Sequence, residues 1–453
     1  MSPDLVRCVS GCTTHDRGMV ARLSRGVPLG RSLARASARP VTAILVGLSC
    51  LLTACHSTTS THERGLAASS GPTSTATTTG THTETGSVSA ARPSPPFRHR
   101  IPGMPPVIDN DVYSQTRAGM LARRVRHDPS YLYVPDSRGS TVTVISQRTH
   151  RIVRLIPTGY LSQHVVPSYD LRTLITNSSY ADELVEINPR TARRTRAISM
   201  PRPYNLYFTP DGKTAVVMIE QYDTIRFADA KTFATIKDLR YPGCLGPNHA
   251  DFSGNGRFFV VTCEFSGELL KVSTLGHRVM GVLHLDPHPT APHAAPMTMG
   301  RSVPQDIRIS PDGRTFYVAD MGTNELRLID ARTFRQRRTI GLPRMPHGLY
   351  PSRDGKDLYI SDRGAGRVSV LRFATNRIVD TWTIPGGGSP DMGGVSADGR
   401  TLWLSGRNDG VVYGFDTRTG TLIAKIPVGG SPHGIAVWPQ PGRYSLGHTG
   451  NMR

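Results

Sequence analysis

Two histidines of this chain lie in nearly the same local sequence. His347 is part of MPHGLYPSRDG (residues 345–355) and His433 is part of SPHGIAVWPQPG (431–442). Each stands between a proline and a glycine, ahead of a short apolar stretch. Because the pattern recurs, a structural repeat has to be considered before any isolated site. The chemistry of these histidines therefore depends on what else repeats with them.

Aligning the repeats brings further imidazole, carboxylate and amide groups into register. The position of His347 and His433 is also occupied by Gln163, Tyr204, Asn248, Gln305 and Asp391, and the next position by His164, Asn205, His249, Asp306, Gly348, Met392 and Gly434. Imidazole and carboxylate groups suit a divalent transition metal. We therefore expect a ligand-binding ring at a channel mouth, made of His164, Asn205, His249, Asp306, His347, Asp391 and His433.

Two interpretations of this ring stay open. No short H-x-H or H-E-x-x-H spacing is present, so the site rests on repeat register alone. In the first interpretation a small molecule or a divalent metal binds there, although the sequence itself requires no cofactor. In the second, the polar residues only line a water-filled channel and satisfy exposed backbone groups.

The elements that carry these residues repeat about every 43 residues. Turns centred on Asp170, Gly212, Gly256, Gly313, Gly355, Gly399 and Gly442 are spaced by 42, 44, 57, 42, 44 and 43 residues. An alternating apolar run follows each turn, such as TFYVADM from residue 315 or TLWLSGR from 401. Period-two alternation with β-branched and aromatic residues predicts half-buried strands. With the strands that follow, each unit contains four.

Seven units of four antiparallel strands are typical of a β-propeller. The runs TFYVAD, DLYISD and YLYVPD resemble the YVTN β-propeller repeat family over residues 131–442. The resemblance implies a seven-bladed all-β propeller. The chain enters with three outer strands (131–157) and ends with an inner strand (433–439), so we expect that strand to close the ring by completing the first blade.

The resemblance does not decide between binding and catalysis. Related propellers include binding proteins, sugar-lactone hydrolases and the haem or quinoprotein domains of oxidoreductases. A lactonase needs a metal held by acidic and amide side chains; Asp306, Asp391, Asn205 and Asn248 are present, but Glu is absent from the ring. No nucleophile elbow, Walker loop or dinucleotide fingerprint occurs. We therefore expect a ligand- or protein-binding module, with a metal-dependent hydrolase or a redox-associated propeller as the alternative.

The 57-residue spacing marks an insertion at residues 285–302, LDPHPTAPHAAPMTMGRS. It should lie at the same mouth as the ring. His288, His293, Met297 and Met299 are placed there to cover the opening or to reach a soft metal. A proline-rich loop with incidental histidines is the alternative.

The N-terminal region has the pattern of a bacterial lipoprotein leader. Arginines precede the apolar run VTAILVGLSCLLTAC (41–55), whose end, LTAC, resembles a lipobox. We expect residues 1–54 to be a signal peptide, with Met19 as an alternative start, and Cys55 to receive lipid. Residues 55–100 are Ser/Thr-rich and are expected to form a disordered tether. A lead-in segment (101–130), the propeller (131–442) and a segment (443–453) follow; the last resembles the tail of actinobacterial relatives and is expected to dock on the ring.

The charge of the chain suggests its partners. The formal net charge is +20, and such a surface attracts anionic polymers. The arginines are scattered, without the spacing of a nucleic-acid motif, so we expect no specific nucleic acid. We expect a monomer, lipid-anchored to the outer face of the cell membrane, that meets an anionic wall polymer or an envelope protein.

Two cysteines, Cys244 and Cys263, remain beyond the leader and the lipid-bearing Cys55. Both are placed near one inner strand, in a compartment where disulfides persist. A bond between them would stabilise the fold by about 3 kcal/mol in the chain-entropy model. Two buried free thiols are the alternative. No CxxCH motif is present, which argues against a covalently attached c-type haem.

Overall fold

The computed structural model describes residue 97 and residues 99–286 and 300–453. The leader, Cys55 and all but the end of the tether lie outside the described residues, as do His288, His293, Met297 and Met299 of the insertion. Within the described ranges, no helix is long and apolar enough to cross a membrane.

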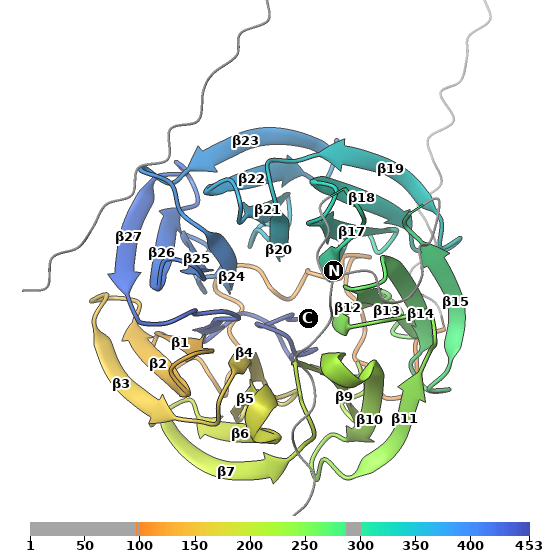
Figure 1. The fold of residues 1–453 in the computed structure, drawn as a ribbon, viewed down its shortest axis with the longest axis horizontal. Helices are drawn as coiled ribbons and strands as arrows, with labels where there is room; N and C mark the ends of the chain where they lie inside the picture. The colour runs from red at the N-terminus through yellow and green to blue at the C-terminus, as the bar shows by residue number, and fades with distance from the viewer. Residues whose placement is uncertain (1–96, 98, 287–299) are drawn as a thin grey trace, which may run out of the picture. The chain divides into compact units, whose positions relative to one another are not determined.

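The described chain folds into seven sheets of four antiparallel strands, arranged as the blades of a ring (Figure 1). The predicted seven-bladed propeller is confirmed. Blade one contains β1 (Tyr131–Asp136), β2 (Thr141–Ser146), β3 (Ile152–Pro157) and β28 (Ala436–Trp438). Blade two contains β4 (Ser162–Pro167), β5 (Leu174–Ser178), β6 (Glu183–Asn188) and β7 (Arg193–Ser199), and blade three contains β8 (Asn205–Phe208), β9 (Thr214–Ile219), β10 (Thr224–Asp229) and β11 (Thr235–Arg240).

In the other four blades, as in blades two and three, the strands follow one another in the sequence from the inner to the outer edge. Blade four contains β12 (Pro247–Phe252), β13 (Phe258–Cys263), β14 (Glu268–Ser273) and β15 (Val279–His284), and blade five contains β16 (Pro304–Ile309), β17 (Thr315–Asp320), β18 (Glu325–Asp330) and β19 (Gln336–Gly341). Blade six contains β20 (Pro346–Pro351), β21 (Asp357–Asp362), β22 (Arg367–Arg372) and β23 (Arg377–Thr383), and blade seven contains β24 (Pro390–Val395), β25 (Thr401–Gly406), β26 (Val411–Asp416) and β27 (Leu422–Pro427). Short 3₁₀ turns, η1 (Ser179–Ala181) and η2 (Glu220–Tyr222), follow β5 and β9.

The core lies between neighbouring blades. Inner strands such as β12 and β16 are buried along their whole length, whereas the outermost strands β3 and β19 are mostly exposed. Tyr359 and Trp382 of blade six pack against Leu402 and Phe415 of blade seven in one apolar cluster. Since each blade buries both faces of its sheet, apolar burial holds the ring together and leaves the channel to polar residues.

The ring closes through the strand that the sequence analysis assigned to this task. β28 pairs with β1 in antiparallel register, Tyr131 opposite Trp438 and Tyr133 opposite Ala436. Gln147 Nε2 donates to the carbonyl oxygens of both Tyr131 and Trp438. The expected closure is confirmed.

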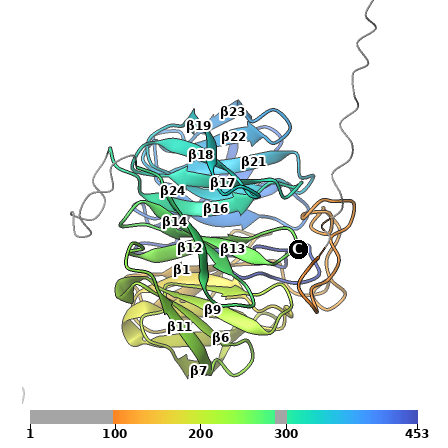
Figure 2. The ribbon, with the colours of Figure 1, turned by 90° about the vertical axis from the view of Figure 1, so that its right-hand side faces the viewer.

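Residues 101–130 lie against one flat side of the ring, which is also the side of segment 443–453 (Figure 2). Trp438 Nε1 donates to Asp128 in the first of these segments. Segment 443–453 is almost wholly buried. Its Gly447 has a φ of +96°, and a Cβ there would lie 2.4 Å from the carbonyl oxygen of Leu206, so only glycine allows this close approach.

Cys244 and Cys263 form a disulfide within blade four, as predicted. Cys263 ends β13, and Cys244 precedes β12, the inner strand of the same hairpin. The bond therefore fastens the entry of an inner strand to the strand beside it, and the alternative of two free thiols is wrong.

Candidate metal centre in the central channel

Inner strands lose their regular pairing at the two positions that the repeat alignment singled out. In five blades two successive inner-strand residues stand opposite one residue of the second strand, which is a β-bulge. A bulge re-aims side chains away from the ladder, so consecutive polar residues can turn towards the channel. The bulged pairs are Gln163–His164, Asn248–His249, Gln305–Asp306, His347–Gly348 and Asp391–Met392.

Three histidines meet in the channel and form what we call the inner triad: His164 of β4, His249 of β12 and His448 of segment 443–453. Each offers one ring nitrogen, and these nitrogen atoms lie within 4.8 Å of one another. All three side chains are fully buried. Nitrogen ligands around a tetrahedral ion are about 3.4 Å apart for a metal–nitrogen distance near 2.1 Å. A small inward movement of the rings would therefore bring the three nitrogen atoms to the spacing of a tetrahedral site.

Hydrogen-bonding contacts fix the orientation of the inner triad. His164 Nδ1 lies 3.0 Å from the carbonyl oxygen of Tyr204. The Asn205 amide nitrogen lies 3.2 Å from His249 Nδ1 and 3.0 Å from His448 Nδ1. The Nε2 atoms of the three rings have no hydrogen-bond partner among the described residues. Because buried polar atoms are normally paired, three such atoms in one place constitute a donor set for a ligand.

The inner triad is electrically neutral at neutral pH. Burial, together with the neighbouring His448, lowers the pKa of His164 to about 3. Burial likewise holds the pKa values of His249 and His448 well below the usual 6.5. Neutral imidazole is the form that binds a metal, so protons do not compete with a metal ion for these nitrogen atoms near pH 7.

The outer triad consists of His347 of β20, Asp391 of β24 and His433, and its ligand atoms also lie within 4.8 Å of one another. His347 Nδ1 is 3.1 Å from Asp391 Oδ1, and His433 Nε2 is 3.5 Å from Asp391 Oδ2. The ring centroids of His433 and His164 are 4.7 Å apart. The two triads are therefore in contact.

Two guanidinium groups distinguish the outer triad. Arg363 Nη1 lies 3.3 Å from Asp391 Oδ1, and Arg407 Nη1 lies 3.8 Å from Asp391 Oδ2. Burial lowers the pKa values of His347 and His433 well below 6.5, and the positive charges of both arginines lower them further. The Asp391 carboxylate thus has two cationic partners already.

The two remaining ring residues of the predicted site have other roles. Asn205 contacts the rings of the inner triad rather than offering a ligand oxygen. Asp306 accepts hydrogen bonds at 2.9 Å from the N–H groups of Ile307 and Leu349 and lies 3.4 Å from Arg308 Nη1. Its carboxylate is thereby occupied, although His448 Nε2 is 3.6 Å away. Asp306 therefore joins neither triad.

The channel at this level is filled rather than open to water. All seven predicted ring residues are at most 2% exposed. His448 stacks on Tyr207 and Asn451 donates to Asp251, so segment 443–453 occupies the space that an empty channel would leave. Gly434 permits this packing, since a Cβ there would lie 2.2 Å from His164 Cδ2.

A further ring surrounds the mouth beyond the outer triad. It consists of the residue that directly follows the second strand of each blade, and we call it the mouth ring. Arginines occupy blades six and seven and glutamates occupy blades three and four, so the ring is basic on one side and acidic on the other. Its members are Ser137, Ser179, Glu220, Glu264, Met321, Arg363 and Arg407.

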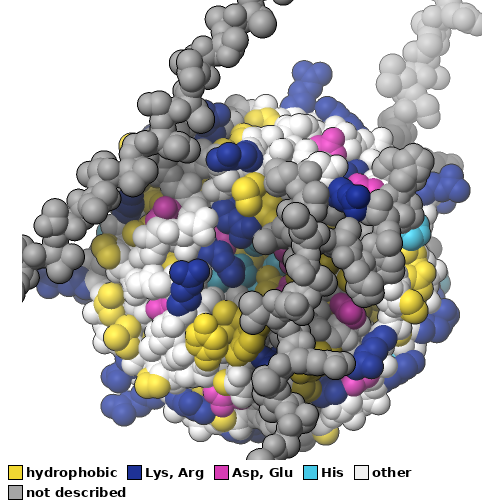
Figure 3. All heavy atoms as spheres, viewed as in Figure 1, with side chains coloured by type: hydrophobic (Ala, Val, Ile, Leu, Met, Phe, Trp, Pro, Cys, Tyr) yellow, Lys and Arg dark blue, Asp and Glu magenta, His cyan; other side chains and the backbone are white. Residues whose placement is uncertain are grey.

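On the acidic side of the mouth ring the carboxyl groups of Glu220 and Glu264 influence each other. Burial and the neighbouring Glu264 carboxylate raise the pKa of Glu220 well above 4.5. Glu264 accepts a hydrogen bond at 2.8 Å from Asn248 Nδ2. Figure 3 views this face of the propeller, and arginine or lysine atoms are visible beside histidine atoms near its centre.

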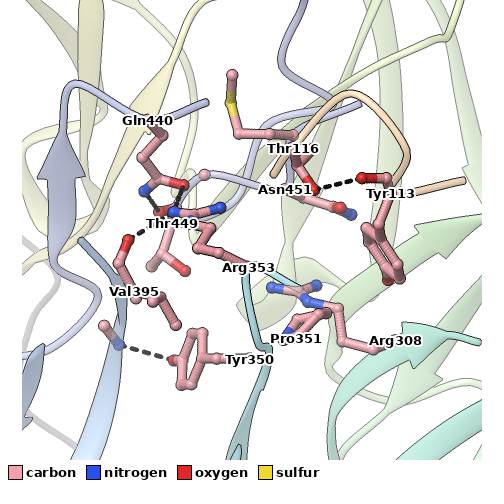
Figure 4. Close-up of a pocket in the computed structure, with 14 residues that line it drawn as sticks. Tyr113, Thr116, Arg308, Tyr350, Pro351, Arg353, Val395, Gln440, Thr449 and Asn451 are labelled. Atoms are coloured by element: carbon pink, nitrogen blue, oxygen red, sulfur yellow. Dashed lines mark hydrogen bonds between the residues drawn. The ribbon is translucent and has the colours of Figure 1, made fainter. Parts of the chain in front are cut away.

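The opposite end of the channel is closed. A cavity of only about 40 Å³ remains there (Figure 4), lined among others by Arg308, Tyr350, Arg353 and Asn451. Arg353 donates to the carbonyl oxygens of Val395 and Ser396. Ligand pockets for organic molecules usually hold several hundred Å³. An organic ligand of ordinary size therefore has no room at this end of the channel.

Sequence reasoning missed the third histidine of the inner triad. His448 stands in LGHTGN, beyond the last repeat, so register could not align it with the other histidines. The arginines and glutamates of the mouth ring could have been found from the sequence. Each directly follows the second strand of its blade, a strand of the YVAD type, and therefore occupies the same position in every repeat.

Known proteins share the architecture of this chain. A family model described as "Lactonase, 7-bladed beta-propeller" matches residues 126–337. The chain is 28% identical over 138 residues to Antigen Lp49 of Leptospira interrogans serogroup Icterohaemorrhagiae serovar copenhageni (strain Fiocruz L1-130), which covers 28% of this chain and 29% of the antigen. The match thus spans less than a third of that relative's length.

Solved structures are similar over most of the described chain. Hydrazine synthase of Kuenenia stuttgartiensis matches with a TM-score of 0.53 and 17% identity, over 64% of this chain and 92% of that one. A functionally unknown protein from Desulfotomaculum acetoxidans DSM 771 gives 0.54 and 16%, over 68% and 98%. The dihydro-heme d1 dehydrogenase NirN, in complex with DHE, gives 0.52 and 13%, over 71% and 79%. At these identities the similarity concerns the fold alone, a seven-bladed propeller.

Proposed function

We propose that this protein is a metal-binding module of the cell envelope, in which the inner triad holds one first-row transition-metal ion. Export and a lipid anchor at Cys55 are part of the proposal and rest on the leader pattern of residues 1–55. The propeller is then a rigid frame that presents a buried metal to the outside of the cell.

One observation carries the proposal: three buried, neutral histidines each bring one ring nitrogen to within 4.8 Å of the others, and their Nε2 atoms have no hydrogen-bond partner among the described residues. Leaving three imidazole nitrogens unpaired costs folding free energy, on the order of 1–3 kcal/mol for each group. A metal ion offsets that cost by accepting the three lone pairs once the Asn205 amide turns its oxygen towards Nδ1 of His249 and His448, because a neutral ring that accepts a hydrogen bond at Nδ1 carries its proton on Nε2. Contacts from Tyr204 and Asn205 behind the rings are the kind of support that orients histidine ligands.

The donor set narrows the choice of metal. Imidazole suits Zn²⁺, copper, iron and nickel, whereas Mg²⁺ and Ca²⁺ prefer oxygen ligands. Three protein ligands also leave a coordination position free for a water molecule or another ligand. We therefore propose Zn²⁺ or copper and an open fourth position.

Metal analysis of the purified protein tests the proposal. After treatment with chelator and reloading with Zn²⁺ or Cu²⁺, elemental analysis should find one tightly bound equivalent. His249→Gln should lower the affinity by at least about a hundredfold, since loss of a direct ligand costs more than loss of an outer contact. His284→Gln changes a half-exposed histidine on the outer strand β15 and should leave binding unchanged. No bound metal, or equal affinities in the two variants, contradicts the proposal.

A partner outside the protein belongs to the same proposal. The net charge of +20 favours anionic surfaces, so we propose that the monomeric module meets an anionic wall polymer or an acidic envelope protein. Sedimentation of the module with isolated cell walls, reversed at high salt, is the expected result.

A metal-dependent hydrolase is the second candidate. It is favoured by the lactonase family model that matches residues 126–337 and by the three-histidine donor set, which leaves room for a metal-bound water. Turnover of lactones by the metal-loaded protein that is lost in His249→Gln would favour this candidate over a pure binding module.

A further inference from the structure

We propose that the basic side of the mouth ring binds a small oxyanion, a carboxylate or phosphate group held between Arg363 and Arg407. The inference rests on the proposed function in one respect: the anion is the ligand that would reach the metal through the mouth. The anion site itself is built from residues outside the inner triad.

The charge count around Asp391 carries the proposal. One guanidinium is enough to neutralise this carboxylate, yet two arginines from adjacent blades approach it. The single negative charge of Asp391 therefore faces two guanidinium groups. An uncompensated charge close to a buried site is costly, and an incoming anion removes that cost.

Both guanidinium groups have hydrogen-bond donors to spare. Arg363 directs Nη1 at Asp391 and Nη2 at the Met321 thioether, which is a weak acceptor. The Arg407 side chain makes no hydrogen bond to another described residue, and its ion pair to Asp391 is 3.8 Å long. A guanidinium carries five N–H donors in a planar fork that matches carboxylate and phosphate oxygens. An anion can therefore bind without displacing Asp391.

Exposure places the anion on the solvent side of the pair. The side chains of Arg363 and Arg407 are 11% and 25% exposed, whereas Asp391 is 0% exposed. Solvent therefore reaches the guanidiniums but not the carboxylate behind them. Partial burial also weakens the competition from water and strengthens each ion contact.

The acidic side of the mouth ring fixes where an anion settles. Glu220 and Glu264 stand in blades three and four and the arginines in blades six and seven, although the positive charge of Arg407 still acts on the Glu220 carboxyl and lowers its pKa. They repel an anion on their side, and so the ligand binds between the two arginines. Asp391 contacts His433, whose ring touches that of His164, so the anion site adjoins the inner triad.

Anion binding can be measured directly on the full-length protein. Metal-free and Zn²⁺-loaded samples would be titrated calorimetrically with oxalate in one arm and with inorganic phosphate in the other, at low ionic strength. We expect at least one of these probes to bind with a Kd of about 1 mM or tighter. Arg407→Gln should weaken binding about tenfold or more, the scale of a lost charge-assisted contact.

Control variants distinguish the loss of an anion contact from a change in folding. Glu220→Gln alters the same ring on its acidic side and should bind the anion as well as the native protein or better. Arg363→Gln repeats the test in case Arg407→Gln alters folding, which thermal unfolding of each variant would reveal. Equal affinities in Arg407→Gln, Arg363→Gln and the native protein would overturn the proposal, as would absence of binding in both arms.

The two proposals fail separately. If metal binds but neither oxalate nor phosphate does, the anion site is wrong and the metal centre stands. If an anion binds the metal-free protein in an arginine-dependent way and no metal binds, the anion site stands and the metal centre is wrong.

Discussion

The two triads occupy the same channel and touch each other, but their surroundings differ. The inner triad has three neutral imidazoles, supported by an amide and a carbonyl group and free of acidic ligands. The outer triad has a carboxylate, which would normally favour a cation, and two guanidinium groups that contact this carboxylate. The difference teaches that a ligand set alone does not define a metal site. We propose that the charges next to the ligand atoms decide whether a cation or an anion binds.

The largest expected effect concerns what the triads share, their neutral histidines. In the metal-free protein the histidine pKa values are lowered, to about 3 for His164. Between that value and 6.5 the unfolded state binds more protons than the folded state, so stability is full above pH 6.5 and falls as the pH decreases. Each histidine contributes about 1.4 kcal/mol per pH unit. Urea unfolding at pH 7, 6 and 5 measures the slope.

Variants of each triad sharpen this test. His249→Gln in the inner triad and His433→Gln in the outer one should each reduce the slope by about one proton. A free energy of unfolding that does not change between pH 7 and pH 5 would show that these histidines are not neutral.

The next largest effect separates the triads. Asp391→Asn should destabilise the protein by about 2–3 kcal/mol, because two arginines lose their buried counter-ion while retaining some contact with water. Metal binding at the inner triad should persist. Asp362→Asn is the control: burial raises the pKa of Asp362 to about 8, so its carboxyl is already largely neutral at pH 7. Equal destabilisation of the two variants in urea would remove the electrostatic distinction.

Loss of the Asn205 amide, which contacts two rings of the inner triad, should have a smaller effect, and this effect concerns the affinity for Zn²⁺. Asn205→Ala removes the amide that contacts His249 and His448 and should weaken Zn²⁺ binding by roughly 10–100-fold. Competition with a chromophoric chelator gives the affinity. Asn376→Ala, at a distant turn of blade six, should bind Zn²⁺ as the native protein does. If Asn205→Ala also does so, the amide does not position the rings.

The smallest expected effect tests whether the arginine charges are what distinguishes the outer triad from the inner one. If guanidinium charge keeps cations away from the outer triad, the double variant Arg363→Gln/Arg407→Gln should bind a second Zn²⁺ ion there, with an affinity at least about tenfold above that of the native outer triad. Titration followed by elemental analysis counts the equivalents. A stoichiometry that stays at one would mean that geometry, rather than charge, excludes the second ion.

The sequence was sufficient for the fold because the same local pattern occurs seven times. Alternation of apolar residues after each turn defines a second strand, and β28 was identifiable because SPHGIAVWP repeats MPHGLYP. The disulfide followed from the position of two cysteines beside one inner strand. These are local signals, and repetition reinforces each of them.

The channel was only partly predictable. Register placed His164 and His433 at the axis but could not show which side chains face one another, since bulges set the direction of each. Asp306 illustrates the limit, because its carboxylate turns to backbone N–H groups that a sequence does not display. His448 lies outside the repeat, and its position depends on how segment 443–453 packs into the finished ring.

The origin of the inner triad has a consequence for biosynthesis. Its histidines come from blade two, from blade four and from a segment that follows blade seven, so they are translated early, midway and late. A chain emerging with its N-terminus first can hold His164 and His249 in place only as two separated donors until residue 448 has been made and the ring has closed. A synthesis product cut short before residue 448 lacks the third histidine, and one cut short before residue 436 lacks the closing strand as well. If the inner triad holds the metal that we propose, metal retention therefore marks those molecules that have been completed and correctly closed.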